Sequence, residues 1–131
     1  MAVLVDTNVI SDVIHGDPLW AEWSKARMVE FDDCLIINPL VYAELCCHAE
    51  SEDEVENIMV VLGLQYQELP RASLYLASKA FQIYRKRGGA KTSPLPDFFI
   101  GAHAAALGIP ILTRDVARYR TYFPTVTLIS P

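Results

Sequence analysis

Short apolar runs rich in β-branched residues alternate along the chain with segments of helical periodicity. The runs predict strands that are apolar on both faces, because their hydrophobic positions are continuous rather than alternating. The segments between them place apolar residues three and four positions apart, which is the spacing of one helix face. The predicted strands are Ala2–Val5, Cys34–Ile37, Leu64–Leu69, Pro110–Thr113 and Val126–Ile129, and the predicted helices are Ser51–Gly63, Arg71–Arg87 and Leu95–Leu107.

Strands of this kind alternating with helices indicate a parallel sheet covered on both faces, so the expected fold class is α/β. The 131 residues contain no repeat and no linker, and we expect a single domain over residues 1–131. Apolar residues make up 52 % and charged residues 21 %, which excludes a disordered tail or a fibrous repeat. No apolar run approaches the roughly 18 residues that span a bilayer, so we expect no membrane association.

The three cysteines suit a reducing compartment, because they are odd in number and two of them are adjacent. Asp6 interrupts the apolar amino-terminal segment where a signal peptide would need further hydrophobic residues, and we therefore expect a cytoplasmic protein. There is no Cys-x-x-Cys pair and the three histidines lie far apart in sequence, which argues against a zinc site.

The net charge of −5 conceals a division of charge along the chain. Residues 1–68 contain 14 acidic and 2 basic side chains, a balance of −12, whereas residues 69–131 contain 2 acidic and 9 basic side chains, a balance of +7. The two halves could simply form solvated faces of opposite sign. They are equally compatible with a positive face that binds a phosphate backbone, so the overall charge does not exclude a nucleic-acid partner.

Two acidic residues directly follow predicted strands. Asp6 ends the first strand, and Asp115 follows the strand that ends at Thr113. Either carboxylate could merely cap the next helix. Both nevertheless occupy the carboxyl end of a strand, which is where ligands bind in open α/β sheets.

Two further acids fall in or beside helical segments. Glu44 has apolar neighbours at helical spacing, where a carboxylate costs several kcal/mol unless a positive group meets it. A buried salt bridge would meet this need, but the first half of the chain offers only Lys25 and Arg27. Asp97 opens the third predicted helix, where an acid commonly interacts with the helix dipole, and Gly101 keeps the face below it small.

The four acids together indicate a cluster of carboxylates at one end of the sheet. Like charges about 4 Å apart repel by several kcal/mol at an effective dielectric of about 20, so such a cluster needs a cation. Oxygen ligands without clustered His or Cys select Mg²⁺ or Mn²⁺ over zinc. Ions bound in this way can activate water and stabilise the attacking and leaving oxygens of phosphodiester hydrolysis.

Four segments in register resemble the PIN-domain nucleases, and more closely the VapC-type toxins of bacterial toxin–antitoxin pairs. The resemblance covers essentially the whole chain. It implies a PIN-like three-layer sandwich whose central parallel sheet has the strand order 3-2-1-4-5, with helices on both faces. The segments are Val3-Leu4-Val5-Asp6-Thr7-Asn8, Ala43-Glu44-Leu45, Pro96-Asp97-Phe98-Phe99-Ile100-Gly101-Ala102 and Ile111-Leu112-Thr113-Arg114-Asp115.

The same resemblance implies a Mg²⁺- or Mn²⁺-dependent endoribonuclease. Many relatives carry Asn at the position of Asp115 with a further acid nearby, whereas no acid follows Asp115 here. His103 stands where relatives often have a small residue or Thr, and we expect it to be a packed helix residue. The implied catalytic and metal-binding acids are Asp6, Glu44, Asp97 and Asp115, and the positions that would orient them or bound waters are Thr7, Asn8 and Thr113.

The partners implied by the resemblance are a cognate VapB-type antitoxin and a second copy of the chain, as a homodimer or within a toxin–antitoxin hetero-oligomer. Antitoxins of such pairs commonly insert an apolar segment, sometimes with an Arg, towards the acidic pocket. Trp20 and Trp23 could line that contact or could simply be buried in the core.

Basic residues near the predicted acids are candidates for RNA binding. Arginines interleaved with Tyr119 and Tyr122 suit the phosphates and unstacked bases of single-stranded RNA. A solvated loop and a cationic helix C-terminus would account for the same residues. The candidates are Arg85, Lys86, Arg87, Lys91, Arg114 and Arg118.

Other functions are compatible with an acidic α/β domain. A PIN nuclease could process cellular RNA without an antitoxin, and an antitoxin-like reading frame beside the gene would decide between these two. A receiver-like signalling module needs an Asp after its third strand and a Lys after its fifth, but Glu68-Leu69-Pro70 and Ile129-Ser130-Pro131 contain neither. Four intact acids argue against an inactive binding protein.

Overall fold

The computed structural model describes all residues from 1 to 131 and contains five strands and seven helices. None of the helices is both long and apolar enough to traverse a lipid bilayer. In chain order the elements are β1 (Val3–Val5), α1 (Thr7–His15), α2 (Ala21–Glu30), β2 (Leu35–Ile37), α3 (Pro39–His48), α4 (Glu52–Leu62), β3 (Gln65–Tyr66), α5 (Arg71–Lys86), α6 (Pro96–Leu107), β4 (Ile111–Leu112), α7 (Ala117–Tyr122) and β5 (Leu128–Ile129).

All strand pairs are parallel, and the sheet order is β3-β2-β1-β4-β5, which confirms the predicted fold. The central strand β1 pairs with β2 on one side and with β4 on the other, and Leu4 lies opposite both Ile36 and Ile111. Every residue of β1, β2 and β4 is buried, as expected for strands with apolar side chains on both faces. Strands are added outwards from β1 to β2 and β3 on one side and from β4 to β5 on the other, so the switch point lies between β1 and β4.

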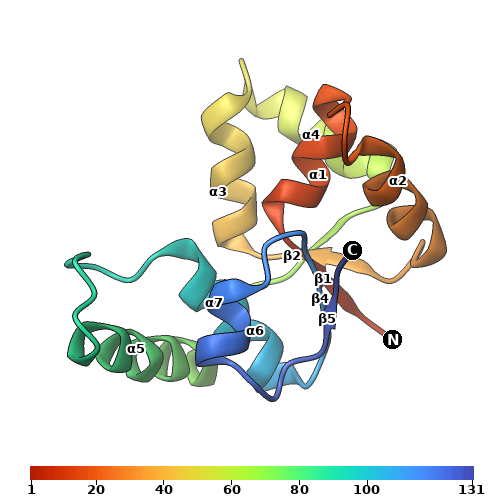
Figure 1. Ribbon diagram of the computed structural model, residues 1–131. Helices are drawn as coiled ribbons and strands as arrows, with labels where there is room; N and C mark the ends of the chain where they lie inside the picture. Colours follow the sequence, from red (N-terminus) through yellow and green to blue (C-terminus); the bar gives the residue numbers. More distant parts are fainter.

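The helices form two layers around this sheet. Right-handed crossovers place α1 to α4, which connect β1, β2 and β3, on one face, and they place α5 to α7 on the other. Figure 1 shows this separation, with α1, α2 and α4 grouped on one side of the strands and α5, α6 and α7 on the other. Both layers meet at the carboxyl edge of the sheet, where α3 packs against α6.

Side-chain caps fix where the helices begin. Asp6 accepts the backbone N–H of Thr7 at the start of α1, and Asn38 accepts two N–H groups at the start of α3. Gly63 and Gly108 end α4 and α6 with φ of +66°, a left-handed conformation that disfavours other residues. Polar caps therefore stand immediately after β1 and β2, at the edge where the site forms.

The predicted strands and helices are confirmed, although the strands are shorter than their apolar runs. The segment around Glu44 is helical, as the analysis of its apolar neighbours assumed. The sequence did not predict α2 or α7. The apolar residues of α2 show little segregation to one face. Helix α7 has only 6 residues, and four of them are Arg or Tyr.

His103 and Gly101 both pack inside the domain from α6. His103 is fully buried, and its Nδ1 lies 3.2 Å from the side-chain amide nitrogen of Asn38. This confirms His103 as a packed helix residue. Gly101 is buried against the ring of Phe123, and a Cβ atom on Gly101 would lie 2.3 Å from a ring carbon. The absent side chain therefore allows the segment after α7 to approach α6.

We predict that Gly101→Ala destabilises the domain by about 1–3 kcal/mol in urea unfolding, because the buried Phe123 ring has to move. Helix propensity alone would favour Ala over Gly by about 1 kcal/mol, so a net loss isolates the clash. Ala106→Leu is the control, since Ala106 is exposed on the same helix and should leave stability within about 0.5 kcal/mol. An unchanged or increased stability of Gly101→Ala would show that Phe123 does not constrain this position.

Candidate active site

Asp6 is the most deeply buried acid of the candidate site, with 6 % of its surface exposed. Its Oδ1 accepts the N–H of Thr7 at 2.8 Å, and its Oδ2 accepts the hydroxyl of Thr113 at 2.9 Å and that of Tyr119 at 2.8 Å. Burial raises the pKa of Asp6, whereas the bonds from Tyr119, Thr113 and Thr7 oppose that rise. Asp6 is thus both the cap of α1 and a carboxylate held in one orientation.

Thr113 and Asn8 link this carboxylate to the segment that carries Asp115. The Asn8 side-chain amide donates to Thr113 Oγ1 at 3.3 Å, and its Oδ1 accepts the N–H of Arg114 at 3.1 Å. Thr113 Oγ1 also accepts the N–H of Asp115 at 3.0 Å. The polar residues after β1 and β4 therefore form one hydrogen-bonded unit across the switch point.

Glu44 lies in α3 and has no basic partner in a salt bridge. Its Oε1 instead accepts the hydroxyl of Thr7 at 2.9 Å. Burial raises the pKa of Glu44, the bond from Thr7 lowers it, and the charge of Asp6 raises it further. The partner of the Glu44 carboxylate is therefore the hydroxyl of Thr7, and not the basic side chain of a buried salt bridge.

Asp97 stands in the first turn of α6 and is paired with Arg118, whose Nη1 lies 3.7 Å from Asp97 Oδ2. Desolvation and then the charge of Asp6 raise the pKa of Asp97 to about 6, while Arg118 lowers it. Asp115 and Glu44 raise it as well. The charges of the other three acids therefore all act on Asp97, although these acids come from three different parts of the chain.

Asp115 is the exposed member of the group and lies between β4 and α7. Its charge contributes to the raised pKa of both Asp6 and Asp97. The structure accordingly brings the four predicted acids to one region at the carboxyl edge of the sheet, together with Thr7, Asn8 and Thr113. Arg118 is the single cation that forms a salt bridge with any of the four acids.

The chemistry of these donors fits a hard divalent cation. The four acids, Thr7 and Thr113 offer carboxylate and hydroxyl oxygens, and Asn8 adds an amide. His103 points its Nδ1 at Asn38 rather than at the acids. Desolvation is the largest cause of the raised pKa of Asp97, and repulsion from Asp6, Asp115 and Glu44 adds to it; a cation would offset that repulsion. No three His, Cys, Asp or Glu side chains are grouped closely enough to hold an ion by themselves. A Mg²⁺ ion at this edge would need water for part of its coordination, which Mg²⁺ usually keeps.

An ion pair that the sequence analysis missed supports the segment after β4. Asp12 is buried in α1 and accepts two hydrogen bonds from the guanidinium of Arg114, one of them at 2.8 Å, and another from Ser24 at 2.7 Å. The Arg114 guanidinium also lies 5.5 Å from the ring of Trp20. The only signal in the sequence was a carboxylate three positions after Val9 on an apolar helix face.

The candidate RNA-binding residues occupy different environments. Arg114 is engaged by Asp12, and Arg85 donates from Nη1 to the carbonyls of Gly89 and Lys91 at 3.0 and 2.9 Å, which holds the loop after α5. Lys86, Arg87 and Lys91 are exposed, and Arg118 is half-buried beside Asp97.

The two tryptophans are both partly buried in the structure. Trp20 lies beneath the Arg114 guanidinium, and Trp23 packs against the core. Leu19, beside Trp20, is 81 % exposed.

The fold and the site define a parallel α/β domain with an acid-lined edge at its switch point. The model of one protein family, the PIN domain, matches residues 3–124, and the chain therefore belongs to the PIN-domain family. Members of this family are nucleases, which places the chain among the hydrolases. A comparison with curated protein sequences gave no match.

Solved structures of similar fold include VapBC2 from Rickettsia felis bound to a promoter DNA fragment, with 14% identity over 99% of this chain and 98% of that chain and a TM-score of 0.74. DNA-bound VapBC from Salmonella typhimurium has 17% identity over 99% and 98% of the two chains, with a TM-score of 0.74. FitAcB from Neisseria gonorrhoeae has 18% identity over 97% and 96%, with a TM-score of 0.70. At these identities the likeness shows a shared fold.

We predict that Asp97→Asn stabilises the protein in the absence of divalent cations by about 1 kcal/mol at pH 7, a value reduced by solvent screening at this partly exposed group. A raised pKa means that folding disfavours the charged carboxylate. The penalty is therefore absent below the ordinary pKa of 3.8 and complete above about 6, so the advantage of the variant should shrink as the pH falls from 7 to 4.

The measurement is urea unfolding in EDTA at several pH values, with Asp53→Asn in the exposed first turn of α4 as the control. Asp53 is not among the charges that act on Asp97, so its replacement should bring no gain in stability at pH 7. A destabilised Asp97→Asn protein at pH 7 would contradict the assignment of repulsion to this site.

Proposed function

We propose that this protein is a VapC-type toxin, namely a Mg²⁺- or Mn²⁺-dependent endoribonuclease that forms a single PIN domain over residues 1–131 and is neutralised by a cognate VapB-type antitoxin. The observation that carries the proposal is the way the four acids are joined at the sheet edge where α/β proteins bind ligands. Thr7 bonds to both Asp6 and Glu44, Thr113 bonds to both Asp6 and Asp115, and Asp97 and Asp115 line the same cavity. Membership of the PIN-domain family supports nuclease activity at these acids.

In this mechanism Asp6, Glu44, Asp97 and Asp115 would hold Mg²⁺ or Mn²⁺, in part through bound waters, and the ion would supply an activated water and offset charge on the phosphate oxygens. Thr113 and Tyr119 fix Oδ2 of Asp6, and the Thr7 hydroxyl fixes Oε1 of Glu44, so these carboxylates are oriented before RNA arrives. One of the acids accepts the proton of the attacking water.

The proposed antitoxin partner is supported by similar structures that are named as VapBC bound to DNA and as a toxin–antitoxin complex from Klebsiella pneumoniae. The proposed homodimer rests on the family resemblance alone. An apolar antitoxin segment could contact Leu19 and the partly buried Trp20. The alternative is a PIN nuclease that processes RNA without an antitoxin. If the protein is a toxin, its induction should arrest growth, and co-expression of a small protein encoded beside the gene should relieve the arrest. The alternative predicts no such relief.

We predict that Asp6→Asn and Asp97→Asn each reduce cleavage of single-stranded RNA by about 100-fold or more, because they remove a charge from the cation-binding group. The assay follows purified protein and RNA with Mg²⁺ or Mn²⁺, and in cells the 5′ ends of RNA are mapped after brief induction of the wild type and of Asp6→Asn. Asp53→Asn should cleave as the wild type does, and circular dichroism should show all variants folded. Equal cleavage in EDTA would refute the metal-dependent mechanism.

The exposed cations at the end of α5 give a second prediction. Replacing Lys86 and Arg87 with Glu should weaken RNA binding and reduce the slope of log Kd against log salt by about 1.4, because two phosphate contacts to a single strand are lost. The matched control replaces two other exposed cations of α5 with Glu, namely Arg71 at its start and Lys79 in its middle. Arg85 is left intact because it holds the following loop. If the slope is unchanged, Lys86 and Arg87 lie outside the interface.

A further inference from the structure

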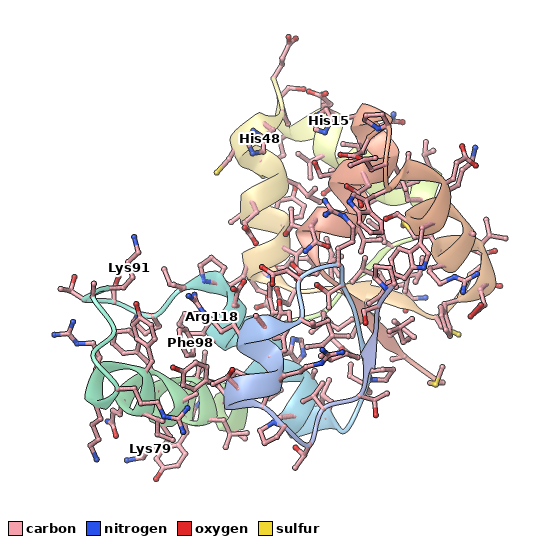
Figure 2. All side chains as sticks on the ribbon, viewed as in Figure 1. His15, His48, Lys79, Lys91, Phe98 and Arg118 are labelled. Carbon is pink, nitrogen blue, oxygen red and sulfur yellow. The ribbon has the colours of Figure 1, made fainter.

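A cavity of about 330 Å³ lies beside the acids, between α5, the start of α6 and α7. Its lining includes Tyr84, Tyr122 and Arg118, and also Asp97 and Asp115 from the candidate active site. Figure 2 shows Arg118 beside Phe98, on the side of α7 that faces α5 and the loop with Lys91. The volume is at the low end of the roughly 300–1,000 Å³ typical of small-molecule sites, which suits a group about the size of one nucleotide.

Aromatic rings form the wall of this cavity away from the acids. Phe98 is fully buried, and the rings of Tyr84 and Tyr122 pack against it with centroids 5.5 and 5.4 Å away. Both tyrosines remain partly exposed at the cavity. The cluster therefore offers a rigid, apolar surface with flat faces at a place that solvent reaches.

Two guanidinium groups lie over these rings. Arg118 is 5.6 Å from the centroid of Tyr84 and 5.4 Å from that of Phe98, and Arg87 is 5.5 Å from the centroid of Tyr122. Planar guanidinium groups and aromatic rings are the surfaces on which proteins stack unpaired bases. Arg118 is in addition paired with Asp97, so the stacking surface and the acid cluster share one residue.

The loop after α5 fixes this wall in place. The N–H of Lys91 donates to the hydroxyl of Tyr84 at 3.2 Å, and Arg85 holds the carbonyls of Gly89 and Lys91. A Cβ atom on Gly89 would lie 2.3 Å from the Tyr84 ring, so glycine allows the loop to close over it. A ring that is already ordered loses little conformational entropy when a ligand stacks on it.

We propose that this cavity binds one unstacked base of single-stranded RNA next to the phosphodiester bond at the acids, a role that rests on the proposed nuclease function. A base fits better than a phosphate, because Asp97 already pairs with Arg118, and Asp97 and Asp115 repel anions there. Tyr122 and Arg118 supply its stacking surface, and the strand has to be single because a duplex keeps its bases stacked on one another.

The test uses ten-nucleotide single-stranded RNAs that carry the fluorescent base 2-aminopurine at one position in turn, titrated with the full chain in EDTA so that the RNA stays intact. We expect the fluorescence to be quenched on binding when 2-aminopurine occupies one particular position. Tyr122→Leu should abolish that quenching and raise Kd about tenfold, within the range for loss of one base–aromatic stack. Tyr122→Phe and Tyr122→Trp should restore both properties, and duplex RNA should show no such quenching.

Tyr75→Leu is the matched control, because Tyr75 is 63 % exposed on the same helix as Tyr84 and has Lys79 5.1 Å from its ring centroid. The wild-type protein alone already decides the matter, whether or not Tyr122→Leu folds. Quenching at no position, or equal losses in Tyr75→Leu and Tyr122→Leu, would overturn the base site. Cleavage of RNA without quenching removes this inference alone, whereas quenching without metal-dependent cleavage removes the nuclease proposal and leaves a nucleic-acid site.

Discussion

The buried carboxylate of Asp6 is the group on which the rest of the site depends. A buried charge of this kind is tolerated only when donors surround it, and its donors come from α1, the end of β4 and α7. Satisfying Asp6 therefore requires the central strand, its neighbour and both helix layers to be in place. The same contacts that make Asp6 tolerable also set its orientation, so folding and formation of the site are one process.

Asp6 is surrounded by hydrogen-bond donors, whereas the charges of the acids around it are only weakly balanced by partners. Arg118 meets Asp97 at 3.7 Å, and Glu44 has only a threonine hydroxyl. Such an arrangement lowers stability relative to one with neutral side chains, and proteins retain local violations of this kind where function needs them. The pKa of Asp97 is raised first by desolvation and then by the charges of the neighbouring acids, so both effects disfavour its ionised form.

Local sequence pattern was enough for the strands, for a parallel sheet and for singling out three acids, whereas the strand order came from the family resemblance. A run of apolar residues followed by Asp identifies a strand end at Asp6 and Asp115, and the lack of nearby cations singles out Glu44. It was not enough for Arg114, which pairs with Asp12 across 102 positions, or for Tyr119, whose hydroxyl reaches Asp6 across 113. These contacts depend on how helices approach one another, and no spacing within a segment encodes that. The site roles themselves stay predictions.

The division of charge along the chain acquires a spatial meaning in the fold. The acidic half forms β1 to β3 with the helices of one layer, and the basic half forms α5, α6 and α7 on the other face (Figure 1). The acids of the site lie where these two layers meet, so a polyanion would be attracted from one side and repelled from the other. This asymmetry favours approach of a polyanion on the side of α5, α6 and α7. A chain of net charge −5 can therefore present a local surface suited to RNA.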